Sequence, residues 1–160
     1  MSEIARIIDQ LGREHGGDPW HGSPLLKILD GVTAAQAGAR PIADAHSILE
    51  LVLHITAWKN EARRRLPGAA AAEPEEGNWP EAGDSSEERW NEARNRLQRA
   101  HDDLLAATSA LPENRLYELP QDQRNRGVGA GVSYYVLLHG VVQHDAYHAG
   151  QIAILRKGVG

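Results

Sequence analysis

Apolar residues recur at intervals of three and four along four long segments of the chain, which is the spacing of one helix face. The first stripe lies in residues 3–13 and consists of Ile4, Ile7, Ile8 and Leu11. The second lies in residues 45–65, the third begins near residue 85 and stops before Pro112, and the most apolar one spans residues 132–157. The pattern therefore predicts four main helices.

Capping residues support these boundaries. Ser47 with Glu50 three residues later predicts a capping box for the second helix, and Asp44 is a competing N-cap. The third helix should begin near Ser85 or Ser86, where the run Ser85-Ser86-Glu87-Glu88 again offers a capping box. Three arginines at residues 63–65 place positive charge where a helix C-terminus favours it.

The segments between the stripes predict connections of different kinds. After a Gly/Pro-rich break at 16–24, Pro24 and Gly31 suit the first turn and the exit of a short helix. Residues 33–41 predict a surface connection with one helical turn, and residues 112–130 a polar one. Residues 67–84 are rich in Ala, Pro, Gly and Glu, which predicts a long, exposed, mobile loop. With no strand pattern and no repeat, the fold expected is all-α: a four-helix bundle with short extra helices.

Length and charge limit the classes of protein. The 160 residues suit a single domain, residues 1–160. No apolar run reaches the length of a membrane span, and charged residues interrupt the first 20 positions, so we expect a cytoplasmic protein with no membrane partner. The net charge is −5 without a basic block, which argues against nucleic acid as a partner.

Histidine and cysteine counts change the picture further, because the chain has eight histidines and no cysteine. The absence of cysteine excludes disulfide scaffolds, thiolate nucleophiles, iron–sulfur clusters and Cys-ligated zinc. A metal ion in this protein would therefore be held by imidazole and carboxylate groups.

His144 and His148 form an H-x-x-x-H pair, which places both imidazoles on one helix face, one turn apart. Two nitrogens at this spacing can converge on one metal ion, although no Glu follows the first His as in the H-E-x-x-H motif. Their face also carries apolar residues, so both should point into the bundle. His54, between large apolar residues of the second helix, is the best third ligand. The alternatives are surface histidines, or core histidines satisfied by hydrogen bonds.

The other five histidines have more ordinary interpretations. His139 should face another element. His46 lies near a helix start, which favours a capping-region or surface role, and from there it could also reach the rim of a site. His15 and His21 lie in or beside the first loop, and His101 is expected on a polar face beside two aspartates.

Three segments together resemble the DinB-like (DinB/YfiT) superfamily: WHGSPLLKILDGVTA, HSILELVLHITAWK and SYYVLLHGVVQHDAYHAGQIAILRK. The resemblance covers most of the chain and rests on a single His in the second helix with H-x-x-x-H-x-G-Q in the last. It implies a four-helix bundle that holds a divalent metal ion through His54, His144 and His148. It also suggests a homodimer, for which Trp20, Trp79 and Trp90 are candidate interface aromatics, each equally explicable as core.

The activity implied by the resemblance is less definite. Some members resemble metal-dependent hydrolases and others are S-transferases that use low-molecular-weight thiols, so the expected partner is a small-molecule substrate, which for the transferase activity includes such a thiol. A metal ion held by neutral imidazoles can lower the pKa of bound water to about 7. Because the chain lacks cysteine, any thiol in the reaction must be a co-substrate. The alternative is a non-catalytic bundle that binds metal or a small ligand, with a stress-related role.

Residues beside the trio are the candidates for catalysis. Gln151, one turn beyond His148, could hydrogen-bond a supporting group or a substrate, while Tyr147 and Asp145 are weaker candidates for proton handling. Asp145 has the alternative of simply facing water, and Trp58 either walls the pocket or packs in the core. Imidazole suits zinc, nickel, iron and copper, so the sequence leaves the metal open. The loops at 16–24, 67–84 and 120–130 are expected to shape the pocket.

Overall fold

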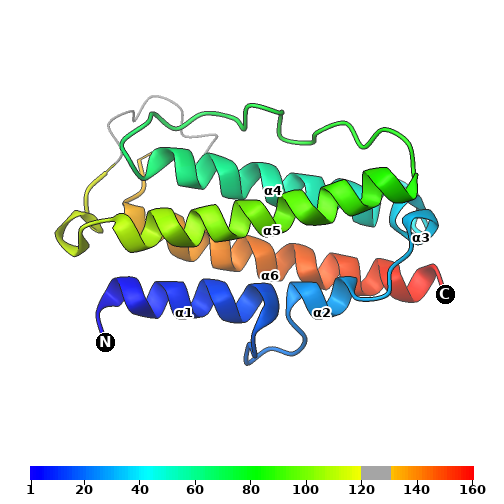
Figure 1. The fold of residues 1–160 in the computed structure, drawn as a ribbon, viewed down its shortest axis with the longest axis horizontal. Helices are drawn as coiled ribbons and strands as arrows, with labels where there is room; N and C mark the ends of the chain where they lie inside the picture. The colour runs from blue at the N-terminus through cyan, green and yellow to red at the C-terminus, as the bar shows by residue number, and fades with distance from the viewer. Residues whose placement is uncertain (120–130) are drawn as a thin grey trace.

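Four long helices form the framework of the computed structural model, which describes residues 1–119 and 131–160 (Figure 1). They are α1 (Glu3–Gly16), α4 (Ile48–Arg65), α5 (Glu87–Ala110) and α6 (Tyr134–Gly158). The shorter elements are α2 (Leu25–Leu29), α3 (Ala34–Gly38) and the 3₁₀ turn η1 (Glu113–Arg115). The described residues contain no strand. The predicted all-α bundle with short extra helices is therefore confirmed, and α1 and α2 lie end to end along one edge of it (Figure 1).

The N-cap of α4 sets the position of the helix that carries His54. The Ser47 hydroxyl accepts a hydrogen bond from the Glu50 amide, and the Glu50 carboxylate accepts one from the Ser47 amide at 2.7 Å. This is the predicted capping box, and it starts the helix three residues later than expected. Asp44 is not the cap, because its φ of 62° places it in a left-handed turn before the helix.

Serines also cap the other two helices of the second half. Ser86, one of the two expected starts, accepts from the Arg89 amide at the beginning of α5, but the predicted capping box does not form, because the third helical residue is Arg89 and not a Glu. Ser133 accepts from the Val136 amide at the start of α6. Each cap satisfies one of the amides that a first helical turn leaves without a partner.

Two apolar clusters fill the bundle along its length. One lies around α2, α4 and α5 and includes Trp90, whose indole donates to the Val32 carbonyl at 2.8 Å. The other joins α1 to α5 and α6 through residues such as Ile7, Leu104 and Leu138. Trp90 is therefore a core residue and not an interface aromatic, whereas Trp20 is fully exposed.

A polar layer interrupts this core where α1, α4, α5 and α6 come together. His15 and His101 stack with ring centroids 3.8 Å apart, and the His15 Nε2 lies 3.2 Å from the Gln98 side-chain oxygen. Across the bundle, Lys59 of α4 forms a buried ion pair with Asp145 of α6. The expectation that His101 lies on a polar face is wrong, because the side chain is turned inward against α1 and only 4% of it is exposed.

The segment 67–84 has no helix or strand, as expected, and runs along the outer side of α4 (Figure 1). It is not simply exposed, because Ala71, Pro74 and Pro80 are buried. The Glu61 carboxylate accepts a hydrogen bond from the Ala72 amide at 2.9 Å and so joins this segment to α4. Part of the polar connection expected at 112–130 lies outside the described residues.

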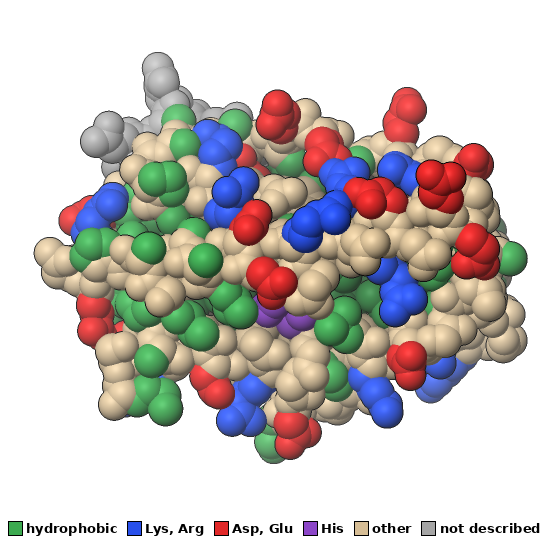
Figure 2. Space-filling view, in the orientation of Figure 1, with side chains coloured by type: hydrophobic (Ala, Val, Ile, Leu, Met, Phe, Trp, Pro, Cys, Tyr) green, Lys and Arg blue, Asp and Glu red, His purple; other side chains and the backbone are tan. Residues whose placement is uncertain are grey.

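The surface shows no strong separation of charge on the face seen in Figure 2, where acidic and basic side chains are interspersed over α4 and α5. Hydrophobic side chains (green) lie between them, and histidine atoms (purple) are visible between α5 and the α1–α2 edge. Within the described residues, no helix has both the length and the apolar character needed to cross a bilayer.

Candidate metal centre

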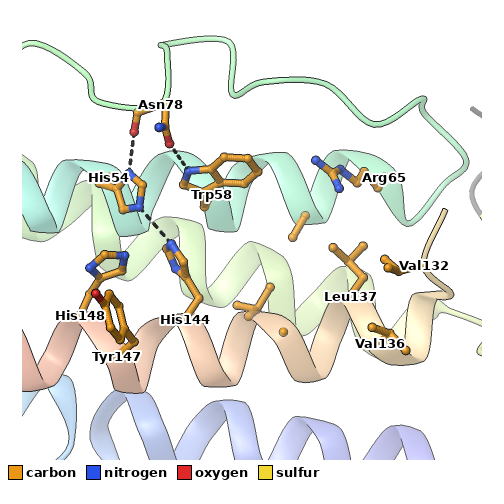
Figure 3. Close-up of a pocket in the computed structure, with 13 residues that line it drawn as sticks. His54, Trp58, Arg65, Asn78, Val132, Val136, Leu137, His144, Tyr147 and His148 are labelled. Atoms are coloured by element: carbon orange, nitrogen blue, oxygen red, sulfur yellow. Dashed lines mark hydrogen bonds between the residues drawn. The ribbon is translucent and has the colours of Figure 1, made fainter. Parts of the chain in front are cut away.

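Three histidines from two helices meet in the interior between α4 and α6 (Figure 3). Each of His54, His144 and His148 offers a ring nitrogen, and these nitrogens all lie within 4.8 Å of one another. The closest pair is the Nε2 of His54 and the Nε2 of His144, which are 3.0 Å apart. The structure thus brings together the three residues selected by the sequence, and no carboxylate of the described chain joins the group.

Two neighbours fix the orientation of these rings. The Nδ1–H of His54 donates to the backbone carbonyl of Asn78 at 2.5 Å, and the Nδ1–H of His148 donates to the Gln151 side-chain oxygen at 2.6 Å. In a neutral imidazole, protonation at Nδ1 leaves the Nε2 lone pair free to bind a metal ion. The supporting hydrogen bonds therefore give both rings the tautomer that a metal ligand needs.

Burial keeps the imidazoles neutral. It lowers the pKa of His54 to about 4, and the hydrogen bond to Asn78 opposes that shift. Burial lowers the pKa of His144 to about 3, with a further contribution from the positive charge that His148 would carry. The pKa of His148 is also lowered by burial, against the hydrogen bond to Gln151. Near neutral pH no proton has to leave these nitrogens before they bind a cation.

Aromatic rings cover the trio on the side of the 67–84 segment. Trp79 stacks on His54 with ring centroids 3.9 Å apart, and His46 also stacks on Trp79, with ring centroids 3.5 Å apart. The Trp58 indole donates to the Asn78 side-chain oxygen at 2.8 Å (Figure 3). His46 therefore lies at the rim of the site, one of its two expected positions, and Trp58 takes the pocket-wall role.

A cavity of about 520 Å³ opens beside the histidines, between α4 and the first half of α6. The trio lies at one end of it, and the side chains of Val136, Leu137 and Val141 line the α6 side (Figure 3). Trp58 and Ala62 line the α4 side. The volume lies within the range of small-molecule sites.

The donor set fits a divalent transition-metal ion. Three neutral nitrogens converge from rigid helices, two of them held in the ligating tautomer, and the space beside them is open to a further ligand. Three protein ligands with room for another is the arrangement of catalytic metal sites, whereas structural sites close the coordination shell.

The three candidates for catalysis lie in different surroundings. Gln151 supports His148, and Tyr147 lines the cavity, 66% exposed, with its ring 5.0 Å from that of His148. Asp145 does not face water, because its side chain points into the core and pairs with Lys59. It points away from the cavity, so we do not assign it proton transfer with a substrate.

Sequence reasoning missed the contribution of Asn78 and Trp79. The loop composition of 67–84 predicted only exposure, and helical periodicity cannot locate a loop residue against a distant helix face. A tryptophan inside a loop that has no other large apolar side chain was the one available signal. Of the loops expected to shape the pocket, 67–84 contributes Asn78, 16–24 contributes no lining residue, and 120–130 lies outside the described residues.

Comparison with known families gives one match. The family model described as the DinB superfamily matches residues 20–152, a range that contains all three histidines and Asn78. The same comparisons returned no match among curated proteins or solved structures.

Proposed function

The chain belongs to the DinB superfamily, and we propose from this premise that it is a metal-dependent enzyme acting on a small molecule. His54, His144 and His148 are the proposed ligands of a divalent ion such as zinc, nickel or iron. The observation that carries the proposal is the convergence of three neutral imidazoles at the end of an open cavity. The reaction classes are hydrolysis and S-transfer from a low-molecular-weight thiol.

The bound ion would supply Lewis acidity, which favours the deprotonated form of a water or thiol that reaches it. The protein contributes orientation, since Asn78 and Gln151 hold two rings with their lone pairs toward the shared space. It also limits access, because Trp79 covers His54 on the loop side and leaves the cavity as the open approach among the described residues.

Metal content tests the first part of the proposal. After loading with zinc and removal of excess, we expect the wild type to retain about one equivalent per chain, measured by elemental analysis. The double variant His54→Ala/His144→Ala should retain almost none. His139→Ala is the matched control, because it removes an imidazole from the same helix outside the trio. Equal metal content in wild type and double variant would refute the site.

Turnover tests the second part. The metal-loaded protein is assayed against esters, amides and pairs of thiol and electrophile, with His148→Ala and His139→Ala in parallel. We expect one class to show turnover that His148→Ala abolishes and His139→Ala retains. Metal binding without such turnover would instead support the alternative function, a non-catalytic bundle that binds metal or a small ligand.

A further inference from the structure

The face of α6 that carries two of the histidines continues into the cavity. Val136, Gly140, His144 and His148 follow one another at intervals of four residues, so they form one stripe along the helix. All four line the cavity. A molecule whose polar end reaches the histidines and whose body follows the cavity therefore passes over Gly140, one helical turn from His144.

Gly140 leaves open space in this stripe. No atom lies within 4 Å of the position that a Cβ at residue 140 would occupy, apart from the backbone of its own helix and its chain neighbours. Glycine in a helix interior is less favourable than alanine by about 1 kcal/mol. Any larger side chain at this position would extend into the cavity.

We propose that the cavity binds the apolar body, an alkyl or aryl group, of the small molecule, and that Gly140 sets how large this group can be. The inference rests on the proposed function, in that the polar head of the same molecule reaches His54, His144 and His148. It assigns a substrate class, namely molecules with an extended apolar group beside the reacting atom, and a specificity-determining residue.

The chemistry of the walls supports an apolar occupant. Val136, Leu137 and Val141 line one side, and Trp58 and Ala62 line the other. Among the described residues that line the cavity, the cationic one is Arg65, and it is already engaged: its Nε donates to the Glu61 carboxylate at 2.9 Å and its Nη2 to the Ala72 carbonyl at 3.1 Å. These contacts favour an uncharged apolar group over an anionic one at that end.

N-alkylimidazoles with chains from methyl to hexyl are suitable probes, because the head can bind a metal ion and the chain can enter the cavity. Their dissociation constants are measured on the Co²⁺-loaded protein by its visible absorption. In the wild type we expect affinity to rise about fourfold for each methylene that enters the cavity.

Gly140→Leu is the decisive variant. Leucine is a good helix former, so the fold should persist, while its side chain takes the space of the alkyl chain. We expect the variant to bind N-methylimidazole with an affinity close to that of the wild type. The gain in affinity per methylene should be lost, so that the variant binds N-hexylimidazole at least about tenfold more weakly than the wild type does. Gly150→Leu is the matched control, because Gly150 is a helical glycine of α6 that is exposed, has equal room and lies outside the cavity.

The outcomes separate this inference from the proposed function. A wild type whose affinity is independent of chain length, or a Gly140→Leu variant with an unchanged gain per methylene, would overturn the inference even if Co²⁺ binds. If Co²⁺ does not bind, the proposed function fails. In that case, calorimetry measures the affinity of the same N-alkylimidazoles for the metal-free protein. If the affinity rises with chain length in the wild type and not in Gly140→Leu, the apolar site is upheld. If the affinity of the wild type does not rise with chain length, the inference is overturned.

Discussion

At the scale of single residues, the orientation of the trio depends on groups that would not themselves touch the ion. Gln151 is the clearest of these, because its side-chain oxygen accepts the Nδ1–H of His148. Asn78 does the same for His54 with a backbone carbonyl, which no substitution of its side chain removes.

We predict that Gln151→Ala weakens metal binding about tenfold, the lower end of what loss of such a supporting hydrogen bond costs. The reason is that His148 loses the acceptor that fixes its tautomer and ring angle. Competition with a chromophoric chelator measures the affinity. Gln143→Ala, an exposed glutamine on the same helix, should leave the affinity unchanged; an equal loss in both variants would contradict the role of Gln151.

The residues of the site differ in how far sequence could locate them. His144 and His148 follow from helical spacing, since a four-residue interval fixes a shared face whatever surrounds it. His54 follows from its apolar neighbours, which imply an inward face. Asn78 and Trp79 could not be located in this way, because a loop has no period that relates sequence to direction.

At the scale of elements, the two helices that carry the trio are joined by a charged contact inside the core. Lys59 on α4 and Asp145 on α6 are both fully buried and face each other. Burial raises the pKa of Asp145, and the adjacent Lys59 ammonium opposes that shift. Lys59 therefore offsets part of the cost of burying this carboxyl group between the two helices.

We predict that Lys59→Met lowers the free energy of unfolding by about 3–5 kcal/mol, because it leaves a buried carboxylate without its cation. The double variant Lys59→Met/Asp145→Asn should recover part of this loss, since the remaining amide carries no charge. Urea denaturation of the metal-free proteins measures both. A double variant less stable than the single one would contradict this account of the pair.

The helices themselves were largely predictable, and their ends were predictable where a side chain closes the first turn. Ser47 and Glu50 mark the start of α4 because the capping box is a local device. The inward turn of His101 was not predictable, since two following aspartates suggested a polar face and only the packing of α1 on α5 decides it.

At the scale of the whole molecule, buried histidines link stability to pH. Burial lowers the pKa of His15 to about 4 and that of His101 to about 3, with Lys59 adding repulsion in both cases. In the unfolded chain these groups have an ordinary pKa near 6.5. As the pH falls below that value the unfolded chain takes up protons that the folded protein does not, so stability is lost.

We predict that the metal-free protein loses stability between pH 7 and pH 5, and that His101→Leu makes this loss shallower. Glu14 has the opposite effect on stability as the pH falls, because burial raises its pKa. Both the wild type and His101→Leu contain Glu14, so the difference between their pH profiles reports the histidine contribution. Urea denaturation at several pH values measures it. Parallel pH profiles for wild type and His101→Leu would contradict the prediction.

The stacking of Trp79 on His54 also gives the protein an optical reporter of its own site. The Trp79 ring is 3.9 Å from that of His54, and the Trp58 ring is 6.4 Å from those of His54 and His144. Indole emission is quenched by a paramagnetic ion at such short range, whereas Trp90 lies in the core against Val32. Occupancy by nickel, copper or cobalt should therefore dim part of the intrinsic fluorescence, and a Trp79→Leu protein should lose much of that response.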